Sequence, residues 1–300
     1  MQNTIPEVQN SELQIKRLAA QRFVYSIAKR SQIAQLVLAI PFTIVLSIFG
    51  LLIPSLAPWQ AIYGVSVLII ETILEDWQKR LRKQAAKIQE LFDCETLGLD
   101  WNELEIGPKP DVETIIEGSN NYLRKMGNFD DLVNWYPPVV GNLPIHLARL
   151  ICQRTNLRWD FQLRRWFAQR ALALTATVIL LLFILSLWNQ LSLERFVLAV
   201  LAPALPVFSW GIKEYRKQKE VADDLERLKS QVEEYWNDAI RSKISAHQVE
   251  VKSRALQDEI YDLRKDSPLI FDTVYRLFRM RYELLATKGA EELVQEALNA

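Results

Sequence analysis

The dominant feature of the hydropathy pattern is a run of 40 residues without a charge, from Ser31 to Ile70. A helix needs about 20 apolar residues to cross a bilayer, so this run is long enough for two crossings. Pro54 and Pro58 stand near its middle, where they favour a reversal of the chain over a continuous helix. The pattern therefore predicts a membrane hairpin with spans at about 33–53 and 58–74.

Two further apolar stretches predict a second hairpin, with spans at about 171–188 and 196–212. The polar residues between them, which end in Glu194 and Arg195, form the expected outer turn. Pro203 and Pro206 lie inside the last span and imply a bent helix whose freed carbonyl groups need partners within the protein.

The distribution of positive charge orients this topology. Of the 36 Lys and Arg residues, 35 lie on one side of the four spans and only Arg195 lies on the other. Because cytoplasmic loops are enriched in these residues, both termini and the central segment are expected in the cytoplasm. The N-terminal helix at 11–30 carries five of the cations, and it is either an interfacial helix or, more commonly, the positive flank of a span.

The predicted fold is an all-α membrane protein, with four transmembrane helices in two hairpins. Its helical cytoplasmic domain is built from the central segment and the C-terminal helices. The expected divisions are a basic helix at 1–31, the first hairpin at 32–75, a cytoplasmic insert of helices and loops at 76–170, the second hairpin at 171–212, and cytoplasmic helices at 213–300.

Shorter patterns predict the details of the cytoplasmic part. Residues 1–10 are expected to be a frayed tail, and 93–143 a turn-rich region with a short helix at 111–126. Apolar residues from Val221 to Ala239 alternate steps of three and four, which is a heptad seam. A helix is expected at 248–265, and Ser267 with Pro268 has the pattern of an N-cap that starts the last helix.

Composition argues against an enzyme. The chain has 36 basic and 36 acidic residues, so no general attraction to DNA or RNA is implied. Two cysteines and two widely spaced histidines predict neither a disulfide framework nor a zinc site. None of the nine glycines is spaced for a phosphate-binding loop, and no nucleophile elbow occurs. We therefore expect no catalytic residues, no bound metal and no cofactor.

Three polar clusters in the cytoplasmic segments are candidates for a ligand site. Amides recognise base edges, guanidinium groups hold phosphates, and indole rings stack on bases. The alternative is structural: a polar seam between helices with an ion pair from Asp160 to Arg164, and core packing for Trp101. Spacing alone favours this alternative. The candidate residues are Gln153, Asn156, Trp159, Asp160 and Arg164; Gln257, Asp258, Tyr261 and Arg264; and Trp101 with Asn102.

Around these clusters the chain resembles a known family, the SMODS-associated four-transmembrane effectors of CBASS, the cyclic-oligonucleotide-based antiphage signalling of bacteria. The resemblance extends across nearly the whole chain. The matching stretches are Leu18–Arg22 with Tyr25, Glu90–Asp93 leading to Trp101 and Asn102, Trp135–Pro137, Cys152–Asn156 with Trp159, Asp160 and Arg164, and Gln257–Tyr261 with Arg264, Ser267 and Pro268.

The resemblance implies a membrane effector of abortive infection. A nucleotidyltransferase of the CD-NTase class would make a cyclic di- or trinucleotide, the cytoplasmic part would bind it, and the spans would disrupt the inner membrane. Membrane lipid and further copies of the chain are then expected partners. The alternative is a constitutive membrane scaffold or small channel that binds another protein through the seam at 221–239.

Overall fold

A computed structural model describes residues 3–42, 45, 57–188 and 202–300, and every regular element in these residues is helical. The all-α prediction is therefore confirmed for the described part of the chain. The helices are α1 (Ile5–Gln9), α2 (Glu12–Val37), α4 (Ala57–Leu97), α5 (Glu103–Ile106), α6 (Val112–Met126), α7 (Ile145–Trp188), α9 (Ala202–Ile240), α10 (Ala246–Asp266) and α11 (Asp272–Leu298), with a π-helical turn η1 (Leu38–Phe42) and 3-10 turns η3 (Asp130–Leu132) and η4 (Pro138–Asn142).

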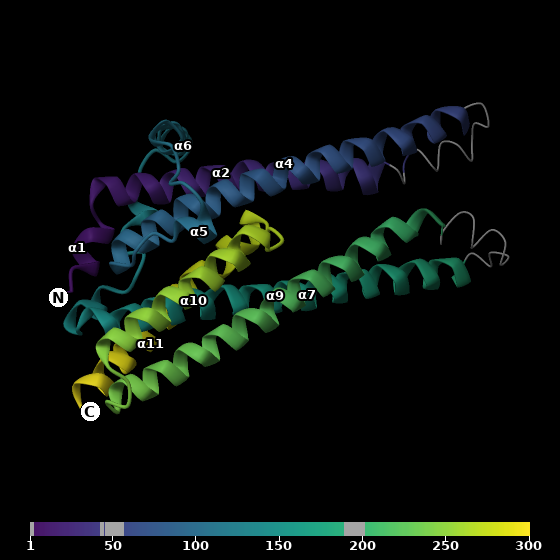
Figure 1. The fold of residues 1–300 in the computed structure, drawn as a ribbon. Helices are drawn as coiled ribbons and strands as arrows, with labels where there is room; N and C mark the ends of the chain where they lie inside the picture. Colours follow the sequence, from purple (N-terminus) through teal and green to yellow (C-terminus); the bar gives the residue numbers. More distant parts are fainter. Residues whose placement is uncertain (1–2, 43–44, 46–56, 189–201) are drawn as a thin grey trace.

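Two long helix pairs form the frame of the molecule. Helix α2 runs beside α4, and α7 runs beside α9 (Figure 1). Both pairs extend toward the same end, away from the two chain termini (Figure 1). At the other end α10 packs against α4, α7 and α9, while α6 packs on α2 and α11 on α7. Segments distant in the sequence therefore meet at the end that holds the termini.

The heptad pattern in α9 packs inside this frame. Leu225, Leu228 and Val232 are buried in the main hydrophobic core, as is Trp236. The predicted seam residues Val221 and Tyr235 are only partly buried against the same core. A straight helix drifts relative to a strict heptad, which explains why Trp236 replaces Tyr235 at the end of the seam.

The prediction of a frayed tail at residues 1–10 is wrong, because α1 is docked on the core. Ile5 is fully buried, and the side chain of Gln9 forms two hydrogen bonds with the backbone of Tyr136. Its Nε2 donates to the carbonyl at 3.1 Å, and its Oε1 accepts from the N–H at 2.7 Å. Pairing both backbone groups of a buried residue offsets the loss of their hydration.

The expected start of the last helix is also wrong. Ser267 is the C-cap of α10, and α11 begins only at Asp272. The residues between them, 267–271, form what we call the α10–α11 linker. Three donors from other helices hold the linker carbonyls. Arg82 donates to Ser267 at 2.8 Å, Arg164 to Pro268 at 2.9 Å and Gln218 to Leu269 at 3.4 Å.

The four expected spans are only partly inside the described residues. The second and third, 58–74 and 171–188, fall within α4 and α7. The first and fourth fall partly on residues 43–44, 46–56 and 189–201, which the structure does not describe. Among the described residues, no helix combines the length and the apolar character that crossing a membrane requires.

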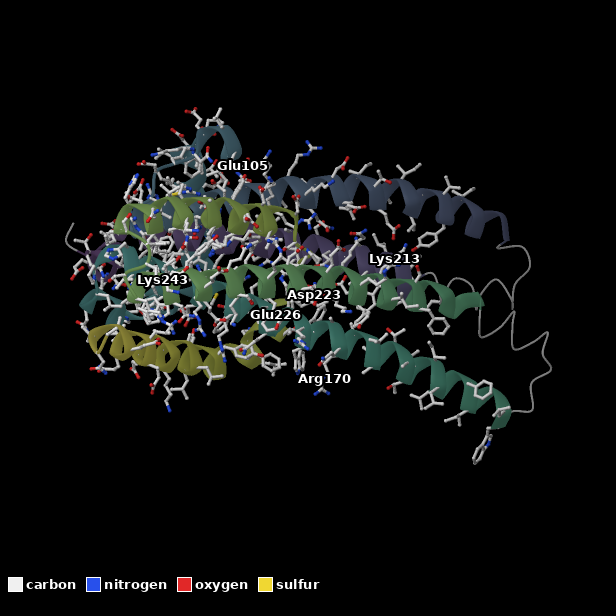
Figure 2. All side chains as sticks on the ribbon, turned by 60° about the horizontal axis from the view of Figure 1, so that its bottom comes forward. Glu105, Arg170, Lys213, Asp223, Glu226 and Lys243 are labelled. Atoms are coloured by element: carbon white, nitrogen blue, oxygen red, sulfur yellow. The ribbon has the colours of Figure 1, made fainter. Side chains whose placement is uncertain are left out.

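Polar and apolar side chains are nonetheless separated along the frame. Nitrogen and oxygen atoms gather around the half of the molecule that holds the termini, and the far ends of α4 and α7 carry mostly carbon (Figure 2). Arg170 and Lys213 lie near the border between the two regions (Figure 2). Beyond it, large apolar side chains are exposed, for example Ile73, Leu174 and Leu187.

Candidate functional site

The described part of the structure contains a cavity of about 680 Å³ in the polar half of the molecule. Its walls come from α2, α4, the segment around η3 and η4, α7, α10, the α10–α11 linker and α11. A volume of this size is in the range of small-molecule sites, which lie preferentially between helices in helical proteins. The cavity therefore joins segments that are far apart in sequence.

Arg22 of α2 lies between two aromatic rings in the cavity wall. The centre of its guanidinium group is 5.4 Å from the ring of Trp135 and 5.7 Å from that of Tyr275, and Nη2 donates to the Tyr275 hydroxyl at 3.3 Å. These contacts orient a cation that forms no ion pair with any described residue. The buried Nε1 of Trp135 has no hydrogen-bond partner in the described part of the chain. The cavity wall thus holds a cation without a carboxylate partner and an N–H donor without an acceptor, as expected where an anionic ligand binds.

Aromatic surface continues along α7 and α11. The ring of Trp159 lies 5.6 Å from Tyr275 and 5.4 Å from Tyr282. Tyr25 of α2 also lines the cavity, and burial raises its pKa to about 12. Planar rings on several sides of one cavity favour a ligand that itself contains flat aromatic groups.

A chain of hydrogen bonds connects the cavity wall to a buried carboxylate. Asp93 is fully buried and accepts from Arg264 at 2.5 Å and from the Tyr136 hydroxyl at 2.6 Å. The same hydroxyl accepts from Nδ2 of Asn156 at 3.0 Å. Burial, and then the negative charge of Asp93, raise the pKa of Tyr136 well above its usual value, so its hydroxyl stays protonated and donates to Asp93.

A second buried carboxylate, Glu90, lies next to Asp93. It accepts from Arg254 at 2.9 Å and from Gln257 at 2.8 Å. Burial and then the charge of Asp93 raise the pKa of Glu90, while Arg264 and Arg254 oppose this rise. Two carboxylates and two guanidinium groups thus balance in charge. Arg264 is held in place by these two carboxylates and also lines the cavity.

Five of the predicted site residues line the cavity, and the structure brings them together from two helices. They are Asn156, Trp159, Asp160 and Arg164 of α7, and Arg264 of α10. The predicted ion pair between Asp160 and Arg164 is present at 3.0 Å. Arg164 also donates to Gln218 of α9 at 2.8 Å and to the linker carbonyl of Pro268, so it joins three segments.

The other six predicted residues lie outside the cavity. Gln153, Gln257 and Tyr261 are buried between helices. Gln153 donates to Gln257 at 3.0 Å, which is the polar seam of the alternative interpretation. Asn102 caps α5 and donates to Asp258 at 3.0 Å, and Asp258 in turn pairs with Arg254.

Trp101 takes part in the packing of the protein interior and does not line the cavity. Its Nε1 donates to the carbonyl of Gly107 at 2.9 Å, and its ring packs against two small hydrophobic clusters. The described residues contain no group of His, Cys, Asp and Glu side chains arranged to hold a metal ion.

Reasoning from the sequence missed three residues of the cavity wall, Arg22, Trp135 and Tyr275. Arg22 and Trp135 lie in stretches that carry the family resemblance, and Tyr275 is on the apolar face of the last helix. Nothing in the local spacing connects them, since Arg22 and Tyr275 are 253 positions apart.

The sequence profile of a family described as the SMODS-associating 4TM effector domain matches residues 3–293. A curated relative, a probable CBASS effector molecule of Bacillus cereus strain VD146, is 25% identical over 261 residues, which cover 85% of this chain and 86% of the relative. No solved structure gives a significant match.

Proposed function

This chain belongs to the SMODS-associating 4TM effector family, and from that membership and the chemistry of the cavity we propose that it is a membrane effector of CBASS antiphage defence. The proposed activating ligand is a cyclic di- or trinucleotide made by a CD-NTase, and the proposed outcome is disruption of the inner membrane and abortive infection. No catalytic step by this chain is part of the proposal.

The observation that carries the ligand proposal is that the cavity wall holds a cation without an ion pair beside an N–H donor without an acceptor. Arg22 has no carboxylate partner among the described residues, and the buried Nε1 of Trp135 has no acceptor there. Phosphate oxygens would satisfy both, and a guanidinium group stacked on an aromatic ring is well suited to hold them. A second guanidinium, Arg264, lines the same cavity; its Nη1 is bound to Asp93, so only its other N–H groups remain to donate to a second phosphate.

The aromatic rings of the cavity would bind the bases of such a ligand. Trp159 and Tyr275 both line the cavity and offer ring surface to a base, which is sequence-tolerant binding worth about 1–3 kcal/mol per stacked base. Partly buried rings next to fixed cations fit a molecule that alternates flat bases with phosphates. Cyclic oligonucleotides have this composition.

We propose that the long helices transmit the effect of ligand binding to the membrane spans. Helices α2 and α7 both line the cavity, and the chain continues from each of them into an expected hairpin. The exposed apolar side chains of α4 and α7 are proposed to contact lipid, with both termini in the cytoplasm. A ligand that favours one arrangement of the helices in the wall would then change the arrangement of the spans, in one copy or in an oligomer.

The alternative of a constitutive scaffold relies on the seam at 221–239 as a surface for a partner protein. Leu225, Leu228 and Val232 of that seam are buried against the rest of this chain, so it offers little free apolar surface. A genetic comparison separates the two functions. The effector should be toxic only when the CD-NTase is active, whereas a scaffold should act equally without it.

The direct test is binding to the purified full-length protein in nanodiscs. We expect a cyclic di- or trinucleotide to bind at micromolar concentration or better. Arg22→Ala should weaken binding at least about tenfold, since charged hydrogen bonds contribute about 1.5–3 kcal/mol. Lys16→Ala is the matched control, because Lys16 is on the same helix and pairs only with the exposed Glu12. Absence of micromolar binding by every cyclic nucleotide would refute the proposal.

Disruption of the membrane is tested in the same preparation. Liposomes that contain the protein should release an enclosed dye when the bound nucleotide is added, and Arg22→Ala should need a higher concentration by the same factor as its loss in affinity. Binding without any leakage would leave the ligand assignment standing and overturn the proposed effect on the bilayer.

A further inference from the structure

One stripe of α7 presents acceptors to the cavity, and their orientation is fixed by the residues behind them. Asn156 and Asp160 are one helical turn apart, and both line the cavity. Trp159 lies in the same wall between them. These three residues combine two hydrogen-bonding groups with one aromatic ring. Proteins recognise bases with side-chain groups of these two kinds.

The amide of Asn156 has a single possible orientation. Tyr136 donates its proton to Asp93, so its oxygen must accept from the neighbouring amide, and Nδ2 of Asn156 is the donor at 3.0 Å. The Oδ1 of Asn156 is thereby left as an acceptor. It forms no hydrogen bond within the described part of the chain.

The carboxylate of Asp160 is fixed in the same way. Its Oδ2 accepts from Nε of Arg164 at 3.0 Å, and Arg164 is itself held by Gln218 and the linker carbonyl of Pro268. The Oδ1 of Asp160 has no donor among the described residues. The stripe therefore offers two oxygen acceptors, one of them charged.

We infer that the ligand of this cavity contains guanine and that Asn156 and Asp160 bind its Watson–Crick edge. This inference rests on the proposed function and specifies its ligand. Guanine has two adjacent donors on that edge, N1–H and the N2 amino group, which match two acceptors. Adenine places the acceptor N1 beside its single amino group, and uracil has one donor between two carbonyl oxygens. Either base would place a lone pair against one of these two acceptors, and such a contact is repulsive and forms no hydrogen bond.

The experiment compares cyclic di-GMP, cyclic di-AMP and cyclic di-UMP on the full-length protein in nanodiscs. We expect cyclic di-GMP to bind at least about tenfold more tightly than the other two, which is within the range of one bidentate base contact. Asp160→Asn should reverse the order toward cyclic di-AMP, because an amide supplies one acceptor and one donor, the pattern that pairs with adenine. Asp223→Asn, on the exposed side of α9, is the control and should keep the preference for guanine.

The outcomes separate this inference from the function on which it rests. Equal binding of the three compounds, or a preference for adenine or uracil, would overturn the assignment of guanine and leave the cyclic-nucleotide effector intact. Failure of all cyclic di- and trinucleotides to bind would overturn both. A reversed preference in Asp160→Asn is a result that general damage to the fold would not produce, and the wild-type comparison stands even if that variant does not fold.

Discussion

Tyr136 connects the charged interior to the wall of the cavity through a single hydroxyl group. It is fully buried, donates to Asp93 at 2.6 Å and accepts from Asn156 at 3.0 Å. Both partners are polar groups that would be left without this bond if the hydroxyl were removed. An unsatisfied buried group costs about 1–3 kcal/mol, more than a typical hydrogen bond contributes on balance.

Tyr136→Phe is therefore expected to lower the free energy of unfolding by about 1–3 kcal/mol, measured as a lower melting temperature in detergent. Tyr25→Phe is the matched control, because no hydrogen bond of the Tyr25 hydroxyl occurs in the described residues. It should stay within about 0.5 kcal/mol of the wild type. Equal melting temperatures of the two variants would contradict the role given to the Tyr136 hydroxyl.

Residues of the site differ in how far the sequence could predict them. Asn156, Asp160 and Arg164 were predictable because helical spacing places them on one stripe. Arg22 and Trp135 form the proposed phosphate site only through tertiary packing, which brings α2 against the segment around η3. Gln153 was assigned to the ligand because it is polar and lies beside the stripe. In the structure it faces α10, where its side-chain amide forms hydrogen bonds with Ser253 and Gln257.

Among the elements, α6 depends on a close crossing with α2. An added Cβ at Gly118 would lie 2.9 Å from both Cα and Cβ of Ala20, a distance that side-chain rotation cannot relieve because it involves backbone. Glycine in a helix interior costs about 1 kcal/mol relative to alanine, so its presence here indicates that close packing is the larger effect.

Gly118→Ala is expected to destabilise the docking of α6 by about 1–3 kcal/mol, less the gain in helix propensity. Faster hydrogen exchange in residues 112–126 would report it. Gly289→Ala provides the opposite case, because nothing lies within 4 Å of its added Cβ, and this variant should be slightly stabilised. Unchanged exchange in α6 of the Gly118 variant would show that the two helices can separate without cost.

The elements also show why the end of the chain was predicted less well than its long helices. The expected helix at 248–265 begins within two residues of the start of α10, where the structure shows a capping box of Ser245 and Gln248. Ser267 and Pro268 have the same local pattern as a helix start, but Arg82, Arg164 and Gln218 bind the carbonyls of the α10–α11 linker. These donors come from three other helices, so no local pattern could predict that the linker stays extended.

At the scale of the whole molecule, the cavity lies between the helices that lead toward the two expected hairpins. Helix α2 is held against α11 across it by an ion pair of 2.6 Å between Lys29 and Asp272. A ligand that contacts both helices and activates the protein must bind one separation of them better than another. By linkage, a cross-link that holds the two helices at the distance of this ion pair should change ligand binding and activation by the same free energy.

A short bismaleimide cross-link between Lys29→Cys and Asp272→Cys should therefore change nucleotide binding and dye leakage together. The native Cys94 and Cys152 will not interfere, because both are buried and burial raises the pKa of each thiol, which keeps them protonated and unreactive. Lys29→Cys treated with the same reagent controls for loss of the ion pair and for modification itself. Leakage by the cross-linked protein at the same nucleotide concentration as this control would mean that α2 and α11 do not move relative to each other, and the change in the spans would then have to be transmitted through α7.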